Sequence, residues 1–419
     1  MPEVVDHSLP VAPRQAPTLW RDKRTLGWAL GLGFSEFGDE IWFVALAYTA
    51  AQLGSPGLAG LVLAAATVPR AVLMLLGGAL TDRFDARRLM IGADIGRVLV
   101  LVGALAMLAA GGVSVGLLLI VGFLFGVADA LYGPAASAFP RQLVVKSELG
   151  RLSGLRQLLV RFAAIFGAPV GGVLVAAYGI SGAMVADALS FLVILVVCVL
   201  VRPRWPRARA TGHSVLSDMR DGLRYLRTTP RVRDLVVTLS GLNVFVSPVV
   251  AVGLALRVSE RGWGPAALGL LSGAIGVGAA VGTLTGMRWR PAYPVRTALG
   301  LLIVQAAGLA LLGLLPFGLT LGTVFAIGVT AGLASPMLVG PFQATVDEEY
   351  LGRTSAVLGI SDNGLMPIAM IGFGALVQVA GLAASTVAFG CAFALLLGLS
   401  LSRPHMRAMR ADGSGTDDV

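Results

Sequence analysis

The sequence predicts an all-α membrane protein in which twelve transmembrane helices form two six-helix bundles. Of its 419 residues, 56% are hydrophobic and only 13% are charged, and the mean hydropathy is +0.83, unlike that of a water-soluble domain. Apolar runs recur at about the 20 residues needed to cross a hydrocarbon core of roughly 30 Å. Because backbone groups in lipid must be satisfied within their own segment, these Leu-, Ala-, Val- and Gly-rich runs predict helices.

The runs fall into two sets of six. After a polar tail at 1–25, the first set lies at about 26–52, 57–81, 88–110, 114–138, 152–178 and 181–201. A linker at 202–233 separates it from the second set, at about 234–257, 264–287, 296–315, 318–342, 353–379 and 382–402, and a second tail covers 403–419. The first apolar run is too long for a signal-peptide core, so it is expected to remain as the first helix.

Basic residues orient the chain. Most of the 32 Lys and Arg residues fall in the tails, the linker and the joints on one side, whereas the opposite side carries only Arg257 and Arg261. By the positive-inside rule, both termini are cytoplasmic. The net charge of +9 follows from this topology and does not indicate a nucleic-acid partner, since the basic residues are spread over many loops.

The linker carries nine arginines and one amphipathic segment, SVLSDMRDGLRYLRTTP. Apolar residues recur there at helical spacing, with Pro230 after the last turn, namely Val215, Met219, Leu223 and Leu226. A helix lying along the cytoplasmic face is therefore predicted. A positively charged spacer that sets topology is the plainer interpretation.

The two halves also resemble each other. LGRLS begins at Leu149 and LGRTS begins at Leu351, an offset of 202 residues. Both segments follow a fourth span of their half, which is where a duplicated six-helix unit places them.

The first helix carries the most informative residues, in the segment SEFGDEIWF. Glu36, Asp39 and Glu40 fall within about 100° of arc on one helical face. Ionisable groups at membrane depth are costly, so they normally face a cavity or a partner. Three carboxylates cannot all stay ionised in a confined site without counter-charges, so at least one is a candidate proton carrier, and Asp39 ranks first beside small Gly38. The alternative is structural pairing with Arg70 of the second helix.

Other charged residues lie deep in the spans. Asp129 and Arg161 join Arg70 as candidates for substrate or proton contact, and gating or packing salt bridges are the alternative for this second set. Asp94 and Arg97 are three residues apart and can pair along one helix face. Arg156 and Asp362 are further candidates for gating salt bridges, and Asp187 is assigned only a helix-anchoring role.

The joint between the second and third spans reads GALTDRFDARRLM. It resembles motif A of the major facilitator superfamily, G-x-L-x-D-R-x-G-R-R, through Gly78, Leu80, Asp82, Arg83, Arg87 and Arg88. In that superfamily the residues at the Asp82 and Arg83 positions are implicated in a cytoplasmic latch that favours the outward-facing state. Asp85 and Ala86 depart from the motif, and the second half has Gly286 in place of the acid.

The fifth span contains FGAPVGG, which resembles the antiporter motif G-P-x-x-G-G of exporters in the superfamily. Gly167, Gly171 and Gly172 keep the glycine spacing, whereas the proline is displaced by one position to Pro169. A seam for close helix packing explains the same residues equally well. The arginine found in the fourth helix of many antiporters is absent from this span.

The resemblance extends over the full chain and is strongest to the bacterial branch of macrolide efflux pumps and the enterobactin exporter. It implies proton-coupled export of small amphiphilic molecules such as drugs, antibiotics or siderophores, by a monomer in the lipid bilayer. Uptake of a metabolite is the first alternative, because a fold does not fix direction. A membrane scaffold or sensor is the second alternative.

No enzyme or cofactor chemistry is predicted. The three histidines lie outside the spans, and the sequence has no P-loop. Cys198 and Cys391 lie in separate apolar spans, so neither a disulfide nor a metal site is expected.

Overall fold

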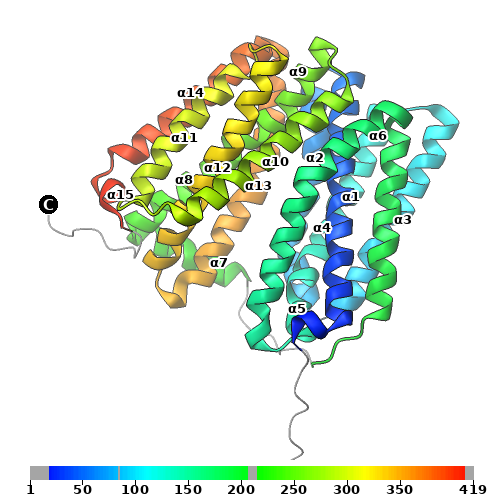
Figure 1. Ribbon diagram of the computed structural model, residues 1–419, viewed down its shortest axis with the longest axis horizontal. Coiled ribbons are helices and arrows are strands. Elements are labelled where there is room, and N and C mark those ends of the chain that lie inside the picture. The colour runs from blue at the N-terminus through cyan, green and yellow to red at the C-terminus, as the bar shows by residue number, and fades with distance from the viewer. Residues whose placement is uncertain (1–17, 84, 206–214, 411–419) are drawn as a thin grey trace, which may run out of the picture.

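The computed structural model describes the backbone of residues 18–83, 85–205 and 215–410, and the side chains of these residues except 74–83, 215–219, 348 and 360–362. The described chain is helical and contains no strand. Helices between residues 23 and 200 gather on one side of the molecule and those between 230 and 402 on the other (Figure 1); they are called the first and the second half below.

The first half consists of long helices joined by short turns, with η1 (Leu19–Arg21) and η2 (Lys146–Glu148) as single 3₁₀ turns. Asp22 caps the first helix by accepting a hydrogen bond from the backbone N–H of Arg24, and Ser114 caps the fourth in the same way. The helices are α1 (Lys23–Leu53), α2 (Pro56–Arg83), α3 (Ala86–Gly111), α4 (Val115–Ala138), α5 (Pro140–Leu143) and α6 (Leu149–Leu200).

The second half has the same character. Its helices are α8 (Pro230–Pro248), α9 (Leu254–Arg261), α10 (Pro265–Arg288), α11 (Pro294–Leu311), α12 (Phe317–Thr345), α13 (Glu348–Ala380), α14 (Leu382–Ser402) and α15 (Pro404–Ala408). A π-helical turn, η3 (Val249–Gly253), joins α8 to α9 without a break. The linker helix α7 (Val215–Thr228) precedes α8.

Ten helical segments in the described chain are long and apolar enough to cross a membrane. One of them contains α6, whose 52 residues would extend roughly 80 Å if straight, far more than a bilayer core needs. It turns back at Gly179, where φ is 64° and a side chain would be strained. The acid-bearing α1 has 31 residues but is not among the ten.

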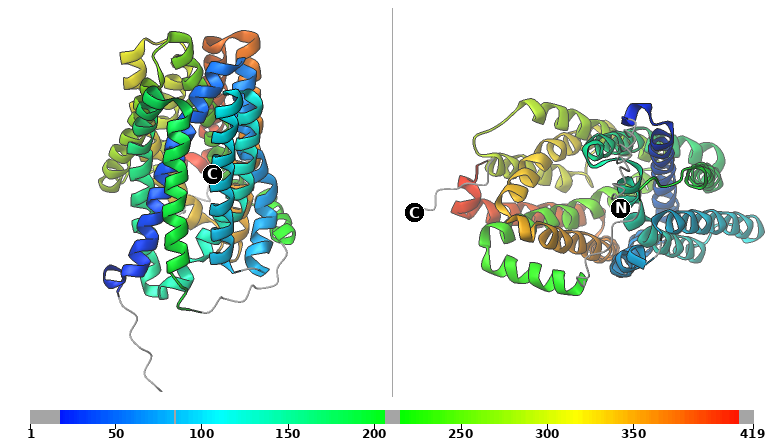
Figure 2. Two further views of the ribbon diagram at one scale, coloured as in Figure 1. Left: turned by 90° about the vertical axis from the view of Figure 1, so that its right-hand side faces the viewer. Right: turned by 90° about the horizontal axis from the view of Figure 1, so that it is seen from below.

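The described start of the chain and α5 lie at one end of the first half, here called the linker end, and α7 and α15 lie on the same side of the second half, which tilts away from the first (Figures 1 and 2). The two halves converge at the opposite end and diverge toward the linker end (Figure 1). At the opposite end, the Ser259 hydroxyl donates to the carbonyl of Ala51 at 3.2 Å, and the Ser55 hydroxyl donates to Gln378 Oε1 at 3.3 Å. The halves therefore meet on one side of the membrane-spanning region in this conformation.

Two glycine pairs allow the halves to come this close. A Cβ added to Gly269 of α10 would lie 3.1 Å from the Cα of Gly172 in α6, and one added to Gly60 of α2 would lie 3.2 Å from the Cα of Gly374 in α13. Backbones therefore touch where α6 crosses α10 and where α2 crosses α13.

Candidate functional site: a polar cavity between the two halves

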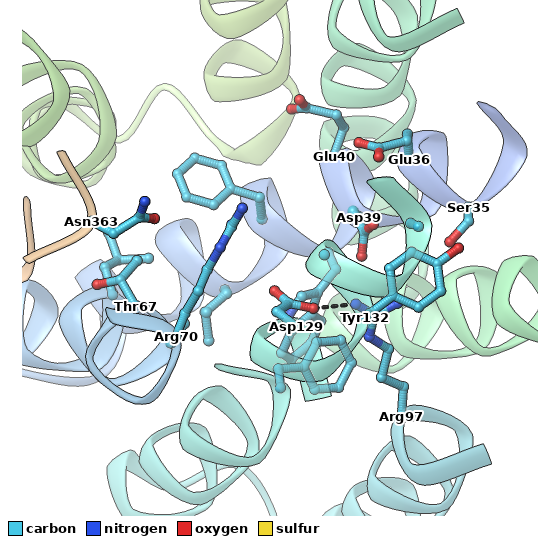
Figure 3. Close-up of a pocket in the computed structure, with 18 of the residues that line it drawn as sticks. Ser35, Glu36, Asp39, Glu40, Thr67, Arg70, Arg97, Asp129, Tyr132 and Asn363 are labelled. Carbon is cyan, nitrogen blue, oxygen red and sulfur yellow. Dashed lines mark hydrogen bonds and ion pairs between the residues drawn. The ribbon is translucent and has the colours of Figure 1, made fainter. Parts of the chain in front are cut away.

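A cavity of about 580 Å³ lies between the halves and is lined mostly by α1, α2 and α4. This volume suits a small organic molecule. Seven of its lining residues in the membrane-spanning part of the chain are acidic or basic, and Figure 3 shows most of them: Glu36, Asp39, Glu40, Arg70, Arg97, Asp129 and Arg156.

Arg97 of α3 is the centre of a buried polar group. Its side chain is only 4% exposed, and it donates to Asp94 Oδ1 at 3.3 Å and to Asp129 Oδ1 of α4. The guanidinium carbon also lies 4.4 Å from the ring centroid of Tyr132 and 4.9 Å from that of Phe191. Two carboxylates and two aromatic rings therefore fix one cation at membrane depth.

The three acids of α1 do not share one environment. Asp39 points toward the group around Arg97, whereas the carboxylates of Glu36 and Glu40 lie farther along the cavity wall (Figure 3). None of the three forms a hydrogen bond or an ion pair with another described residue. Each is therefore available to a proton or a ligand.

Asp187 of α6 lies behind Asp39, although its place in the sequence indicates only a helix anchor. It is fully buried, its Oδ1 accepts from the Ser190 hydroxyl at 3.3 Å, and its Oδ2 has no partner in the described chain. A Cβ added to Gly38 would lie 2.6 Å from Asp187 Oδ1, so the missing side chain at Gly38 admits this aspartate next to α1. Its distance of 148 residues from Asp39 in the chain left no local sequence signal.

Arg70 extends from α2 into the cavity and makes no ion pair with any described side chain (Figure 3). The structure therefore does not contain the pairing of Arg70 with the acids of α1. Arg156 lies at the cavity wall with its guanidinium 5.8 Å from the ring of Trp28, whereas Arg161 is exposed and is not among the lining residues.

The latch residues fall partly outside the described side chains. Gly78, Asp82 and Arg83 lie in the undescribed stretch of α2, and Asp362 lies in that of α13. Arg87 is described: its Nε donates to the carbonyl of Cys198 at 2.7 Å and its Nη2 to that of Val199 at 2.6 Å, so it caps the end of α6. The backbone N–H of Arg88 donates to Asp85, which caps α3.

The glycines of the FGAPVGG segment contact two different partners. A Cβ at Gly167 would lie 2.7 Å from the Cβ of Glu40, and one at Gly171 would lie 2.9 Å from the Cα of Ile41, so both admit α1. Gly172 faces α10 in the second half instead. Pro169, inside α6, also packs on α10, beside Gly273.

Residues 28–370 match the family model of the Major Facilitator Superfamily. The chain is 26% identical to the multidrug efflux pump Tap of Mycolicibacterium fortuitum, over 89% of this chain and 93% of that protein. It is 24% identical to macrolide efflux protein A of Streptococcus pyogenes, over 73% and 76% of the two chains. It is 26% identical to the enterobactin exporter EntS of Citrobacter koseri, over 68% of each. The predicted resemblance to this branch is confirmed.

The fold is similar to that of solved transporters. A crystal structure of a variant of the nucleoside transporter NupG has a TM-score of 0.74 at 14% identity, covering 91% of this chain and all of that one. A D-xylose-proton symporter has a TM-score of 0.71 at 14% identity, covering 93% and 99%. At this identity the likeness establishes the fold alone.

Proposed function

Because the chain belongs to the Major Facilitator Superfamily, it is a multi-pass membrane transporter and not an enzyme, and we propose that it exports small amphiphilic molecules in exchange for protons. The export direction rests on the relatives, which include a multidrug efflux pump, a macrolide efflux protein and an enterobactin exporter. The observation that carries the coupling is the set of unpaired carboxylates of α1 in the cavity, together with Asp187 buried behind them against Gly38, next to Asp39.

In the proposed topology, the chain crosses the inner membrane of a bacterium twelve times. Splitting the long α6 at Gly179 and adding α1 to the ten apolar segments supports this number. Two six-helix bundles, at 26–201 and 234–402, then rock against each other as a monomer. The linker at 202–233 and both tails, 1–25 and 403–419, lie in the cytoplasm, as the positive-inside rule favours.

With this orientation, the described conformation faces the cytoplasm, because the halves meet at the opposite end. A substrate then reaches the cavity from the cytoplasm or the inner leaflet. A proton taken up on Asp39 from the outside resets the carrier and is released inward, so the inward proton gradient drives export. The motif A residues Asp82, Arg83 and Arg87 hold the outward-facing state in this cycle.

Asp39 and Asp187 have a simple part in this cycle. Two acids next to each other in a confined site repel when both are ionised, so a proton on one of them relieves the repulsion. Arg97 already donates to Asp94 and Asp129, which leaves Asp39 and Asp187 as the pair that gains most from a proton.

The test uses purified protein in liposomes loaded with a fluorescent amphiphilic dye or a macrolide. A proton gradient that drives substrate against its concentration supports the proposal, and Asp39→Asn should abolish this movement but keep gradient-free exchange of labelled for unlabelled substrate. Glu349→Gln, at an exposed acid, is the matched control. Accumulation in the opposite direction would indicate uptake, and no gradient-dependent movement of any amphiphile would contradict the proposal.

A further inference from the structure

The two halves contribute different chemistry to the cavity. Every described ionisable side chain in its wall comes from the first half. The second half contributes Asn363, Met366 and Met370 of α13. The side-chain amide of Asn363 donates to the carbonyl of Gly359 at 2.7 Å, which leaves its Oδ1 for the cavity. Methionine side chains are flexible and polarisable and adapt to varied apolar shapes.

The wall carries an excess of acids although the chain as a whole is basic. Four carboxylates and three guanidiniums line the cavity, whereas the chain has a net charge of +9. One of the three guanidiniums, that of Arg97, is already shared between Asp94 and Asp129. The free part of the wall therefore holds three acids against Arg70 and Arg156.

Glu40 is the acid with the least compensation. Its Cβ packs against Gly167, it forms no ion pair with a described residue, and the charged group beside it is Glu36, one helical turn away. Among the basic groups, Arg156 acts most strongly on Glu36. An uncompensated carboxylate at membrane depth costs several kcal/mol, so this pair of acids attracts a cation.

Apolar surface lies close to this pair. Phe43, two turns beyond Glu36 along α1, lines the cavity and is 39% exposed, and Met366 lines the opposite wall. Aromatic faces attract cations, and apolar side chains hold the rest of an amphiphile. An anion would instead need Arg70 or Arg156, which share the wall with the three free acids.

We infer that the cavity selects amphiphilic organic cations, with the positive nitrogen or phosphorus near Glu36 and Glu40 and the apolar body against Met366 and Met370. The inference deepens the proposed function by naming the substrate class. In this binding mode, residues of the first half select the charge of the ligand, and residues of the second half select its shape.

The test compares two probes of nearly the same size and shape but opposite charge, tetraphenylphosphonium and tetraphenylborate. Equilibrium binding of each is measured to the purified full-length protein in nanodiscs. Tetraphenylphosphonium should bind at least tenfold more tightly than tetraphenylborate. Equal or tighter binding of tetraphenylborate would overturn the inference.

Variants locate the two parts of the site. Glu40→Gln should weaken tetraphenylphosphonium binding about tenfold, with Glu36→Gln as a second variant and Glu349→Gln as the unaffected control. Met366→Ala should weaken it three- to tenfold, whereas the neighbouring Leu365→Ala should not, because Leu365 is 44% exposed and outside the cavity wall. Thermal unfolding of each variant shows that it is folded. Full affinity in folded Glu40→Gln and Glu36→Gln proteins would exclude this binding mode.

The proposed transport cycle and the proposed cation site can be refuted independently. Selective, Glu40-dependent binding of tetraphenylphosphonium without any proton-driven movement would refute the proposed transport cycle but support the cation site. Proton-driven export of a neutral or anionic compound by a protein that does not bind tetraphenylphosphonium would support the cycle and refute the cation site.

Discussion

Gly172 and Gly269 come into backbone contact where α6 of the first half crosses α10 of the second. The pairing of Gly60 with Gly374 gives the same contact where α2 crosses α13. Both crossings lie at the end where the halves meet. That end can therefore close only if these backbones can come into contact.

Gly172→Leu should reduce substrate transport at least tenfold, because a leucine side chain at this position would collide with the backbone of α10. The control is Gly103→Leu in α3, where a Cβ would meet nothing within 4 Å. Transport is measured in liposomes and folding by thermal unfolding. Normal transport by the Gly172→Leu protein would show that close contact at this crossing is not needed.

Arg97→Ala should lower the free energy of unfolding by about 3–5 kcal/mol, because it leaves Asp94 and Asp129 without their buried counter-charge. A second change, Asp129→Ala, should restore part of the loss in the double variant. Denaturant or thermal unfolding of the purified proteins measures both effects. A double variant less stable than Arg97→Ala alone would contradict this account of the group.

Asp187→Asn should decrease proton-driven transport while exchange without a gradient continues, because the Asp187 carboxylate lies against Gly38, next to Asp39, and its charge acts on Asp39. Gly38→Ala should lower the free energy of unfolding more than Asp187→Asn does, because its methyl group would collide with the same carboxylate. The ratio of driven transport to exchange is the measurement. A ratio unchanged in Asp187→Asn would restrict proton coupling to Asp39.

Asp22→Ala should release the start of the linker from the first half. Arg204 Nη1 lies 2.7 Å from Asp22 Oδ2, and the backbone N–H groups of Arg204 and Trp205 donate to the carbonyl of Gln142 at 2.9 and 3.2 Å. Trypsin should therefore cut after Arg204 several times faster in the variant. The same digestion of Asp85→Ala, which removes a different helix cap, should match that of the wild-type protein at Arg204.

The same contact has a pH dependence. Burial opposes the charge on Asp22, but the hydrogen bond from Thr25 and the nearby Arg204 outweigh it, so the pKa of Asp22 lies below its ordinary value of 3.8. A lowered folded-state pKa means that the stabilisation is complete above the ordinary pKa and is lost as the pH falls through the lowered one. Acid should therefore remove the difference in stability between wild-type and Asp22→Ala proteins.

Tyr225→Ala should detach α7 from the second half. The ring of Tyr225 stacks on that of Tyr350 with centroids 4.4 Å apart, and its hydroxyl donates to Asp347 Oδ2 at 3.1 Å. Tyr225→Phe keeps the stacking and loses two hydrogen bonds of the hydroxyl, since it also accepts from the backbone N–H of Asp347 at 3.3 Å; each is worth about 0.5–1.5 kcal/mol. Hydrogen exchange over α7 should rise strongly in the alanine variant and slightly in the phenylalanine variant. Equal exchange in all three proteins would show that this contact does not hold α7.

The sequence indicated the helices and the ionisable residues but not their pairing. Hydropathy locates the membrane segments because lipid imposes length and composition on each one locally, and the i, i+3 spacing of Asp94 and Arg97 predicted a pair that the structure contains. The contact between Arg97 and Asp129 joins residues 32 apart, and it depends on how α3 packs on α4. No pattern along the chain records that packing.

The neighbours of the three acids of α1 could not be predicted for the same reason. Helical geometry places Glu36, Asp39 and Glu40 on one face, but it does not say which neighbouring helix each acid meets. The structure turns Asp39 toward α3, α4 and α6, while Glu40 packs beside Gly167. Asp187 was not predicted as a site residue, because its role depends on its contact with α1.

The unequal lining of the cavity also bears on how such a transporter can change over generations. Substitutions at Asn363, Met366 or Met370 alter the fit of a ligand without disturbing any buried ion pair in the described chain. Substitutions among the acids and arginines of the other wall threaten both folding and energy coupling. Resistance to a new compound should therefore be acquired first through α13, which makes this helix the place to look in laboratory selections.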